Sequence, residues 1–316
     1  MEVKLTLFSW NIRQGGGKRI YKQLEVISDL QPDVVALQEM TMHNVDQYAA
    51  LLKDLGLNYV INTFALSKDP SKLIGPRRYG LLIASKWPFK LLNNFSIPWT
   101  ERILGVEMDS PFGRIDIYNS HIPPGSSNGW IKIDTLEGIY NELACHPKIP
   151  RILCGDFNSP QLETKDGELI TWGQRLHKDG TWRVSEKNKR WDEGERNVLK
   201  GLGEYDLRDV FFLVFDSGKR DFSFVLKRKD ILFHRRFDHC FASKSLNPVA
   251  FEYLHNFREE KLSDHSPLVV KFNPEVNDHS DSKQSRIEVW ENQKMEVPKV
   301  KLDKFTYLEG EFEIKK

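Results

Sequence analysis

The stretch RILCGDFNSP, residues 151–160, decides what kind of fold this sequence can form. Its apolar part, residues 152–154, predicts a short buried strand, and Gly155 allows a tight backbone where that strand ends. Asp156 and Asn158 lie two positions apart, so their side chains point the same way in an extended chain. A Ser-Pro pair then breaks the strand. We therefore expect a carboxylate and an amide side by side at the carboxyl end of a strand, where layered α/β proteins bind ligands and metals. An Asx turn that only closes the strand is the alternative.

The bulk composition is that of an ordinary soluble globular protein. The chain has 316 residues and a mass of 36.9 kDa, with 40% apolar and 29% charged residues, enough for one large domain or two small ones. A net charge of +1 excludes a global polycation, so a polyanionic partner must be met by a local patch.

The cysteines and the N-terminus indicate a cytoplasmic location. Three cysteines, without the spacing of a zinc site, argue against a disulfide framework. Cys154 and Cys240 lie in apolar runs and are expected in the core. The first residues lack the basic and apolar regions of a signal peptide, and no stretch reaches the ~18 apolar residues of a membrane span. We therefore expect no membrane span.

The sequence pattern predicts more strands than helices. The expected strands are residues 3–10, 33–37, 59–64, 81–85, 89–97, 102–108, 114–120, 152–154, 222–226, 237–242, 249–254 and 267–272. The expected helices are residues 21–30, 44–55, 130–143, 193–202 and 206–213. Because the strands bunch into hairpins instead of alternating with helices, the pattern predicts two packed mixed β-sheets flanked by helices, an α/β (α+β) fold. The charged, tryptophan-rich segment 160–205 is too long for a plain loop and is expected to be functional or partly structured.

The composition changes after residue 273. We predict a catalytic domain over residues 1–273 and a charged tail over residues 274–316, which holds ten acidic and eight basic side chains. The sequence leaves open whether this tail binds a protein partner, covers the site or stays free, and it leaves the oligomeric state open.

Several predicted strands are followed directly by a polar residue that can bind a metal or move a proton. They are Asn11, Glu39, His121, Asp156 with Asn158, Asp238 with His239, and Asp264 with His265. The set is rich in oxygen ligands and poor in thiols, which suits Mg²⁺ or Mn²⁺. No serine or cysteine nucleophile motif and no phosphate-binding glycine loop is present. A hydrolytic metal site that activates water is the simplest interpretation.

The sequence resembles the endonuclease/exonuclease/phosphatase superfamily, which includes exonuclease III-type AP endonucleases, DNase I-like nucleases and neutral sphingomyelinases. The resemblance rests on motifs that occur in the family order and span residues 9–272. They are SWNI (9–12), LQE (37–39), YGLLIASK (79–86), NSH (119–121), GDFN (155–158), RFDH (236–239) and LSDHSP (262–267). It implies a four-layered α/β sandwich with the site at the rim between two sheets.

The resemblance also implies roles for the polar residues. Glu39 would be the principal Mg²⁺ ligand, with Mn²⁺ as the other candidate metal. Asn11 and Asp264 would complete the metal and phosphate environment, partly through water.

The remaining residues would carry the catalytic roles. Asp156 would orient or deprotonate the attacking water, and Asn158 would hold a phosphate oxygen. His265, aligned by Asp238, would stabilise the negative charge that grows on the phosphate, and His121 would face the phosphate from the other side. These are the groups that in-line attack on a phosphodiester needs.

The family branch stays open. The AP-endonuclease branch usually has Tyr where this chain has His121, whereas the DNase I-like and lipid-directed branches have His. Yet HIPPG, residues 121–125, is similar to the AP-endonuclease layout Y-x-P-N. The Cys-Asp-Arg ending of the inositol phosphatases is absent.

Residues 219–236 suggest the substrate. They carry seven basic side chains against two acidic ones, interleaved with phenylalanines, as suits a nucleic-acid backbone and a stacked base. Arg235 and Arg236 are the expected substrate contacts, and Arg78 is a candidate second phosphate contact. The alternatives are a solvated hairpin with core phenylalanines and, for Arg78, an ordinary surface residue.

The sequence thus predicts a Mg²⁺-dependent phosphodiesterase, a cytoplasmic DNA or RNA nuclease in nucleic-acid processing or repair. The alternatives are an enzyme for a phospholipid or small phosphate ester, and a non-catalytic binding module of the same fold. The intact set of polar residues argues against the last.

Overall fold

Two mixed six-stranded sheets form the centre of the protein. The computed structural model describes residues 5–92, 95–164, 167–215 and 218–274. The first sheet has the order β17 (Pro248–Tyr253), β18 (Leu268–Phe272), β1 (Leu5–Asn11), β2 (Val34–Met40), β4 (Gly80–Ser85), β3 (Tyr59–Asn62). The second has the order β13 (Arg208–Asp209), β16 (Asp238–Ala242), β8 (Arg151–Asp156), β7 (Gly113–His121), β6 (Ile103–Ser110), β5 (Phe89–Leu92).

Alternation along β1 shows why the sheets stack. Leu5 and Leu7 lie in the core between the two sheets, together with apolar residues of β6, β7 and β8. Phe8 and Trp10, on the opposite face, pack in the core under the helices. Because successive side chains of a strand point to opposite faces, β1 is buried on both sides. A strand of this kind reads as a nearly continuous apolar run.

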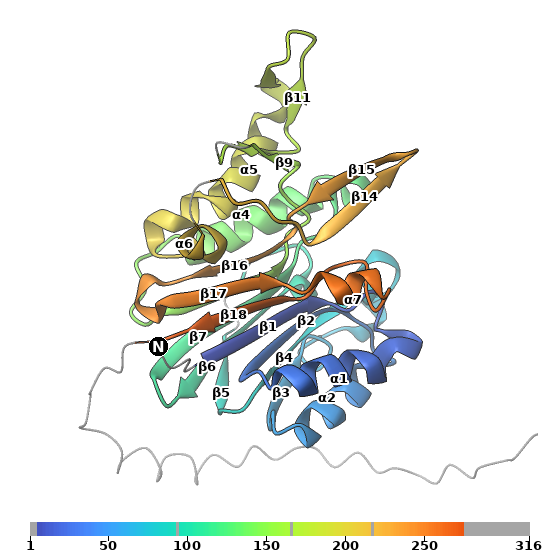
Figure 1. Ribbon diagram of the computed structural model, residues 1–316, viewed down its shortest axis with the longest axis vertical. Helices are drawn as coiled ribbons and strands as arrows, with labels where there is room; N and C mark the ends of the chain where they lie inside the picture. Colours follow the sequence, from blue (N-terminus) through green and yellow to red (C-terminus); the bar gives the residue numbers. More distant parts are fainter. Residues whose placement is uncertain (1–4, 93–94, 165–166, 216–217, 275–316) are drawn as a thin grey trace, which may run out of the picture. The chain divides into compact units, whose positions relative to one another are not determined.

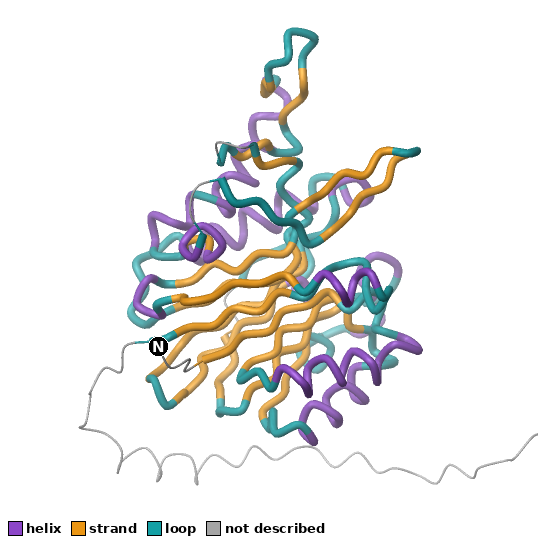
Figure 2. Tube along the Cα trace, viewed as in Figure 1, coloured by secondary structure: helices purple, strands orange, loops and turns teal. Residues whose placement is uncertain are grey.

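Helices cover the outer face of each sheet and complete four layers (Figures 1 and 2). α1 (Ile20–Leu30) and α2 (Val45–Asp54) pack on the first sheet. α4 (Ile131–Leu143) and α5 (Lys189–Leu199) share a core with the second sheet. Three short helices, α3 (Gly125–Asn128), α6 (Val210–Val214) and α7 (His255–Glu259), lie in the connections. The predicted four-layered sandwich of two mixed sheets is confirmed.

Small two-stranded sheets extend beyond these layers (Figure 1). β14 (Phe224–Arg228) and β15 (Ile231–Arg235) form a projecting hairpin. The strand expected at 222–226 is therefore not part of the main sheets. The segment 160–205 is structured, as expected for its length. It contains β9 (Leu162–Glu163), β10 (Leu169–Ile170), β11 (Gln174–Leu176) and β12 (Trp182–Val184), and it leads into α5.

Two predicted helices differ in their bounds. The helix expected at 206–213 begins only at Val210, because Arg208 and Asp209 pair with β16 and the Asp209 carboxylate then caps the helix by accepting from Phe211 N at 3.1 Å. The helix expected at 193–202 begins earlier, at Lys189. At Val210 local capping and strand pairing set the boundary, which apolar spacing alone does not show.

The compact unit that contains both sheets ends at Val276. The predicted tail at 274–316 lies almost wholly outside the described residues, so the boundary after residue 273 stays a prediction. Among the described residues, no helix combines the length and the apolar character that crossing a membrane requires.

Candidate active site

Three neighbouring strands place three site residues in one row across the second sheet. Asp156, at the end of β8, is in register with His121 of the parallel strand β7. It is also in register with Asp238 of the antiparallel strand β16. Asp238 therefore begins a strand, and the expectation that it follows one is wrong. The antiparallel direction of β16 nevertheless brings Asp238 to the same sheet edge.

Gly155 is required directly beneath this row. Its φ is +130°, and a Cβ at this position would lie 1.9 Å from the carbonyl oxygen of Ser120 in β7. No side chain fits at that distance, so only glycine lets β7 and β8 approach each other here. The close approach sets the spacing between His121 and Asp156.

The first sheet supplies Asn11 and Glu39 from the ends of two parallel strands. Asn11 of β1 is opposite Gln38 of β2, and Glu39 follows in a bulge with φ +60°. A bulge re-aims side chains locally. Gln38 turns between the sheets and donates to Asn119 Oδ1 of β7 at 2.8 Å. This buried bridge joins the two sheets beneath the site.

The SDHS motif positions His265. Ser263 Oγ donates to the Asn11 carbonyl at 2.6 Å and accepts from His265 N at 3.2 Å. Trp10 of β1 donates its indole N–H to the His265 carbonyl at 2.9 Å. The hydroxyl and the indole therefore fix the backbone of His265 against β1, which explains why a serine precedes the Asp-His pair.

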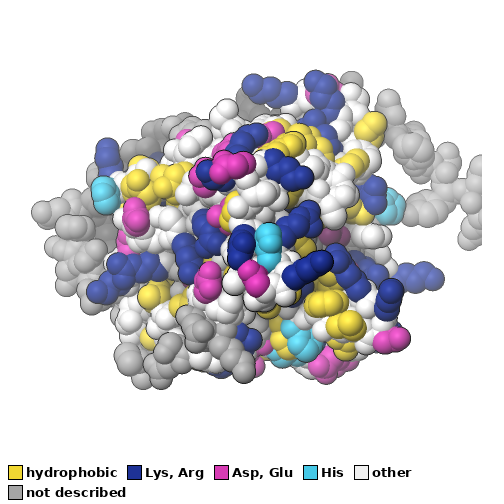
Figure 3. Space-filling model, turned by 90° about the horizontal axis from the view of Figure 1, so that it is seen from above, with side chains coloured by type: hydrophobic (Ala, Val, Ile, Leu, Met, Phe, Trp, Pro, Cys, Tyr) yellow, Lys and Arg dark blue, Asp and Glu magenta, His cyan; other side chains and the backbone are white. Residues whose placement is uncertain are grey.

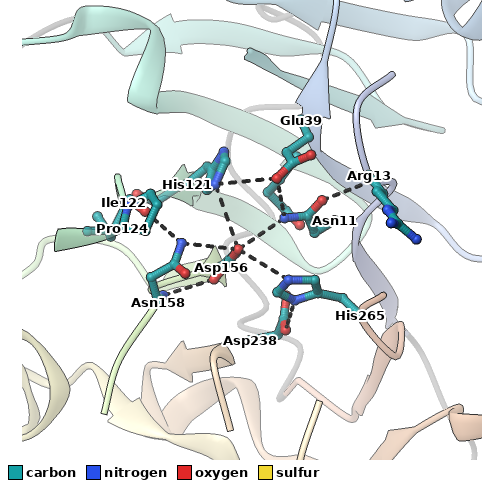
Figure 4. A network of polar contacts seen from close by, with 12 residues as sticks. Asn11, Arg13, Glu39, His121, Ile122, Pro124, Asp156, Asn158, Asp238 and His265 are labelled. Atoms are coloured by element: carbon teal, nitrogen blue, oxygen red, sulfur yellow. Dashed lines mark hydrogen bonds and ion pairs between the residues drawn. The ribbon is translucent and has the colours of Figure 1, made fainter. Parts of the chain in front are cut away.

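Asp156 is the centre of the resulting polar network (Figure 4). Its Oδ2 accepts from Asn11 Nδ2 at 3.0 Å and lies 3.7 Å from the Nε2 atoms of both His121 and His265. Its Oδ1 accepts from Asn158 N at 2.9 Å. The Asx turn that was the alternative interpretation is thus present, and Asn158 still faces the carboxylate, with Nδ2 3.4 Å from Oδ2.

The partner of His121 fixes its protonation state. Arg102, buried beside it, donates to His121 Nδ1 at 2.8 Å. A guanidinium has only donors, so Nδ1 accepts and the proton of the neutral ring sits on Nε2, facing Asp156 and Glu39. Burial lowers the pKa of His121 well below its usual value, and the Arg102 charge lowers it further. His121 is therefore a neutral hydrogen-bond donor.

The partner of His265 gives the opposite result. Its Nδ1 donates to Asp238 Oδ2 at 2.7 Å, and both side chains are buried. Burial alone lowers the pKa of His265, but the carboxylates of Asp238 and Asp156 outweigh it and raise the pKa to about 10. His265 is therefore a buried cation at neutral pH.

Burial also shifts the pKa of Asp156. It raises the pKa of this carboxyl to about 7, against the lowering by the His265 cation, and the nearby Asp238 raises it further. A carboxyl that titrates near neutral pH can both take and return a proton there.

The residues around Glu39 fit a divalent cation. Its carboxylate accepts from Gln14 N at 2.7 Å and from Asn11 Nδ2 at 3.3 Å, and the side chain stays 20% exposed, so it keeps free lone pairs. Asp156, Asp238 and His265 also have ligand atoms within 4.8 Å of one another. Because His265 is protonated, the Glu39 side of the network is the better place for a cation.

Asp264 lies at the outer side of this network. Its carboxylate is 3.6 Å from Arg13 Nε, with both side chains nearly half exposed. Arg13 N also donates to Asn11 Oδ1 at 3.0 Å. Asp264 therefore adds negative charge at the solvent side.

The three arginines expected to bind substrate are in different environments. Arg235 is half-buried, with its guanidinium 5.9 Å from the Trp172 ring and 5.3 Å from the Phe233 ring. Its Nε is buried and makes no hydrogen bond with the residues that the structure describes. Arg78 is exposed and stacks on Tyr79, and its hydrogen bonds reach Gly75 and Tyr79, not the network.

Arg236 is not available to substrate. Its side chain is 2% exposed and forms ion pairs with Glu163 at 2.5 Å and Asp209 at 2.7 Å. Adjacent residues of an extended chain face opposite sides, so Arg236 points into the protein where Arg235 points out. The predicted contact between Arg236 and substrate is a wrong expectation, because two carboxylates already satisfy its charge.

Sequence reasoning missed Arg102. The sequence pattern predicts Arg102 at the start of a strand, whereas it ends a short 3₁₀ turn and donates to His121. A buried arginine is rare unless it is paired, but nothing in the local sequence shows which arginine is buried.

A buried acid lies between a neutral and a charged histidine, with further carboxylates at the rim of a four-layered sandwich, and this arrangement suits a hydrolase. The family model described as "Endonuclease/Exonuclease/phosphatase family" matches residues 8–265. The chain therefore belongs to this family and is a hydrolase. A search of the curated proteins finds no significant match.

Solved structures share the fold. An AP endonuclease from Archaeoglobus fulgidus is 22% identical with a TM-score of 0.62, over 85% of this chain and 100% of that one. The 3′ phosphatase NExo from Neisseria, bound to a product DNA hairpin, is 17% identical with a TM-score of 0.57, over 85% and 100%. ANGEL2, a 2′,3′-cyclic phosphatase in complex with adenosine-2′,3′-vanadate, is 21% identical with a TM-score of 0.57, over 85% and 95%. At these identities the likeness concerns the fold.

Proposed function

We propose that this protein is a Mg²⁺-dependent phosphodiesterase that hydrolyses DNA or RNA by direct attack of water. The observation that carries the proposal is the position of Asp156, buried between a neutral histidine and a cationic one and next to an acidic cation site. A carboxylate of this kind can accept the proton of a water, while donors on both sides stabilise the charge of the phosphate.

Glu39 would hold the metal, with Asn11 and Asp264 beside it. Mg²⁺ is preferred and Mn²⁺ is also suitable, because the donors are oxygen atoms. When bound, such an ion neutralises charge on the phosphate and lowers the pKa of water.

The chain's own residues divide the remaining work. Asp156 orients the water and takes its proton as the new phosphorus–oxygen bond forms and the bond to the leaving oxygen breaks. His265 donates from Nε2 to a phosphate oxygen and, as a cation, stabilises its charge. Its partner Asp238 maintains that charge. His121 donates from Nε2 on the opposite side, and Asn158 offers its amide to another phosphate oxygen.

Basic and aromatic groups near the network support a nucleic-acid substrate. Arg235 lies among aromatic rings with a free donor, and the Trp172 indole donates to the carbonyl of Asn158 at 3.1 Å. Lys227, Arg228 and Lys229 are exposed at the tip of the β14–β15 hairpin. Lys and Arg side chains with apolar ones between them also appear on the face in Figure 3. This mixture suits phosphates and unstacked bases. One of the similar structures is named as an AP endonuclease, and another is bound to a product DNA hairpin.

A cleavage assay with paired variants tests the proposal. Wild type, Glu39→Ala and Asp156→Asn are incubated with labelled single-stranded, double-stranded, abasic and 3′-phosphorylated DNA and with RNA, in Mg²⁺ or in EDTA. We expect Mg²⁺-dependent cleavage by wild type and losses of about 10³-fold or more in both variants. Asp54→Asn, an exposed carboxylate at the end of α2, is the matched control and should keep full activity.

Two outcomes would contradict the assignment. Full activity in both Glu39→Ala and Asp156→Asn would exclude the site. No cleavage of any nucleic acid, together with hydrolysis of a phospholipid or a small phosphate ester, would keep the site and replace the substrate. No hydrolysis of any phosphoester would favour a binding module.

A further inference from the structure

Two oppositely charged side chains are completely buried behind the active site. Lys132 of α4 and Glu195 of α5 approach to 2.6 Å, and their side chains are 1% and 0% exposed. Transfer of two ions from water is costly, so such a pair persists only where further hydrogen bonds satisfy it. Glu195 has those bonds, because it accepts from Trp172 N at 2.8 Å and from Trp191 Nε1 at 3.0 Å.

The remaining bond of the lysine leads to the site. Lys132 Nζ donates to the carbonyl oxygen of Asn158 at 2.9 Å. The Trp172 indole donates to the same oxygen at 3.1 Å. A buried donor from α4 and a half-buried donor from the segment after β10 therefore hold the backbone of one residue in the polar network.

These donors hold a residue with a left-handed backbone conformation. The φ of Asn158 is +49°, in a region that asparagine adopts more readily than most other residues with a side chain. That conformation turns its amide N–H onto Asp156 Oδ1 and its Nδ2 toward Asp156 Oδ2. A change in the backbone at Asn158 would therefore move two groups that contact the central carboxylate.

α5 packs tightly against α4 and against the start of α3. A Cβ on Gly194 of α5 would lie 2.9 Å from Ile133 of α4, and one on Gly125 would lie 2.5 Å from the Trp191 ring. Figure 1 shows α4 and α5 together above the second sheet, with β11 extending beyond them. The two helices therefore cannot shift apart without disturbing the ion pair.

We propose that Lys132 and Glu195 are positioning residues, which act through the Asn158 carbonyl to hold Asn158 against Asp156. Glu195 and Trp172 both belong to the tryptophan-rich segment 160–205. Through these contacts this segment contributes to the active site. The expected effect on kcat rests on the proposed function, whereas the expected effect on the position of Asn158 does not.

The test is the neutral double variant Lys132→Met/Glu195→Gln, which removes both charges at once and keeps an acceptor for the tryptophan N–H groups. We expect kcat for the cleaved nucleic acid to fall about 10- to 100-fold with KM near that of wild type. The thermal unfolding midpoint should change by no more than about 5 °C. The single variant Lys132→Arg keeps a cation and its donors, so its kcat should lie much closer to that of wild type than to that of the double variant.

A second readout does not need activity. In protein labelled with ¹⁵N only at asparagine, the Asn158 signals are identified by their loss in Asn158→Asp. They should shift in the double variant, whereas the signals of Asn141, an exposed residue on α4, should not. Trp172→Phe, which removes one donor and leaves the ion pair, should shift the same signals by less and provides the test if the double variant does not fold.

Unchanged Asn158 signals in the folded variants would overturn the inference, as would wild-type kcat in the double variant. If wild type hydrolyses no nucleic acid, the proposed function fails. The Asn158 signals would then still decide whether Lys132 and Glu195 position this residue.

Discussion

His121 and His265 are both buried, and both place Nε2 at 3.7 Å from the same oxygen of Asp156. Their pKa values are nevertheless shifted in opposite directions, below the usual value for His121 and to about 10 for His265. The difference lies at Nδ1, where His121 accepts from Arg102 and His265 donates to Asp238. Because both rings are buried, the residue behind each ring accounts for the difference in charge between them.

This arrangement gives the site two different donors on the two sides of one carboxylate. A neutral N–H adds no charge and only orients, whereas a cationic N–H also stabilises negative charge. We therefore expect the His265 side to contribute more to catalysis than the His121 side.

The largest effect is expected for Asp238→Asn, which keeps the size of the side chain and removes its charge. The pKa of His265 should fall, so that the ring is no longer a cation at neutral pH and its orientation is no longer fixed. We predict a loss in kcat on the order of 10³- to 10⁴-fold, measured with the nucleic acid that wild type cleaves.

The matched control is Asp116→Asn on β7. This carboxyl is half-buried and contacts Tyr118, not a histidine. Its activity should be that of wild type. A loss of less than 10-fold in Asp238→Asn would mean that His265 does not act as a cation.

A smaller effect is expected for Arg102→Gln, which keeps a donor for His121 Nδ1 and removes the charge. The pKa of His121 should rise, although burial still holds it below its usual value. We predict a loss of about 10-fold in kcat at pH 7. In NMR spectra of the metal-free protein, His121 should titrate at a higher pH in the variant than in wild type.

Arg114→Gln is the control for this change, because Arg114 is exposed on the same sheet and pairs with Glu107. An unchanged His121 titration in Arg102→Gln would show that burial alone sets its protonation state.

The smallest effect concerns stability in EDTA as a function of pH. The folded pKa of His265, about 10, lies above the unfolded value near 6.5. The stability it contributes is therefore fully present below pH 6.5 and is lost as the pH rises through about 10. The slope is at most about 1.4 kcal/mol per pH unit. Asp156 acts at lower pH, since its folded pKa is about 7.

Urea unfolding of wild type and His265→Gln between pH 6 and 10 measures this contribution by difference, which removes the titration of lysines and tyrosines common to both. Parallel stability curves for the two proteins would contradict the raised pKa of His265.

The fold could be predicted because each main strand carries its own pattern. Residues 34–37 and 152–154 are apolar over their whole length, as strands buried on both faces must be. The GDFN motif also shows where β8 ends, so polar groups around Asp156 are predictable, whereas the SDHS motif lies in the connection before β18. The direction of β16 is not predictable in the same way, since an apolar run reads the same way in both directions.

What the sequence could not show is which charged residue is buried. Arg235 and Arg236 are adjacent and chemically identical, and only the carboxylates of Glu163 and Asp209 distinguish them. The same holds for Arg102 and for Lys132, whose partners come from distant segments. Such pairings depend on tertiary contacts, which one sequence does not reveal.

The pairing of β1 with β18 determines when the domain can complete its folding during synthesis. Leu5 faces Phe272, so β1 can pair with β18 only after the whole intervening sequence has been synthesised. Contacts so far apart in sequence form slowly. Asn11 and His265 therefore meet only after almost the whole domain has left the ribosome, and a nascent chain that stops before Leu268 has no complete site. We therefore expect no hydrolysis from a chain that ends before β18.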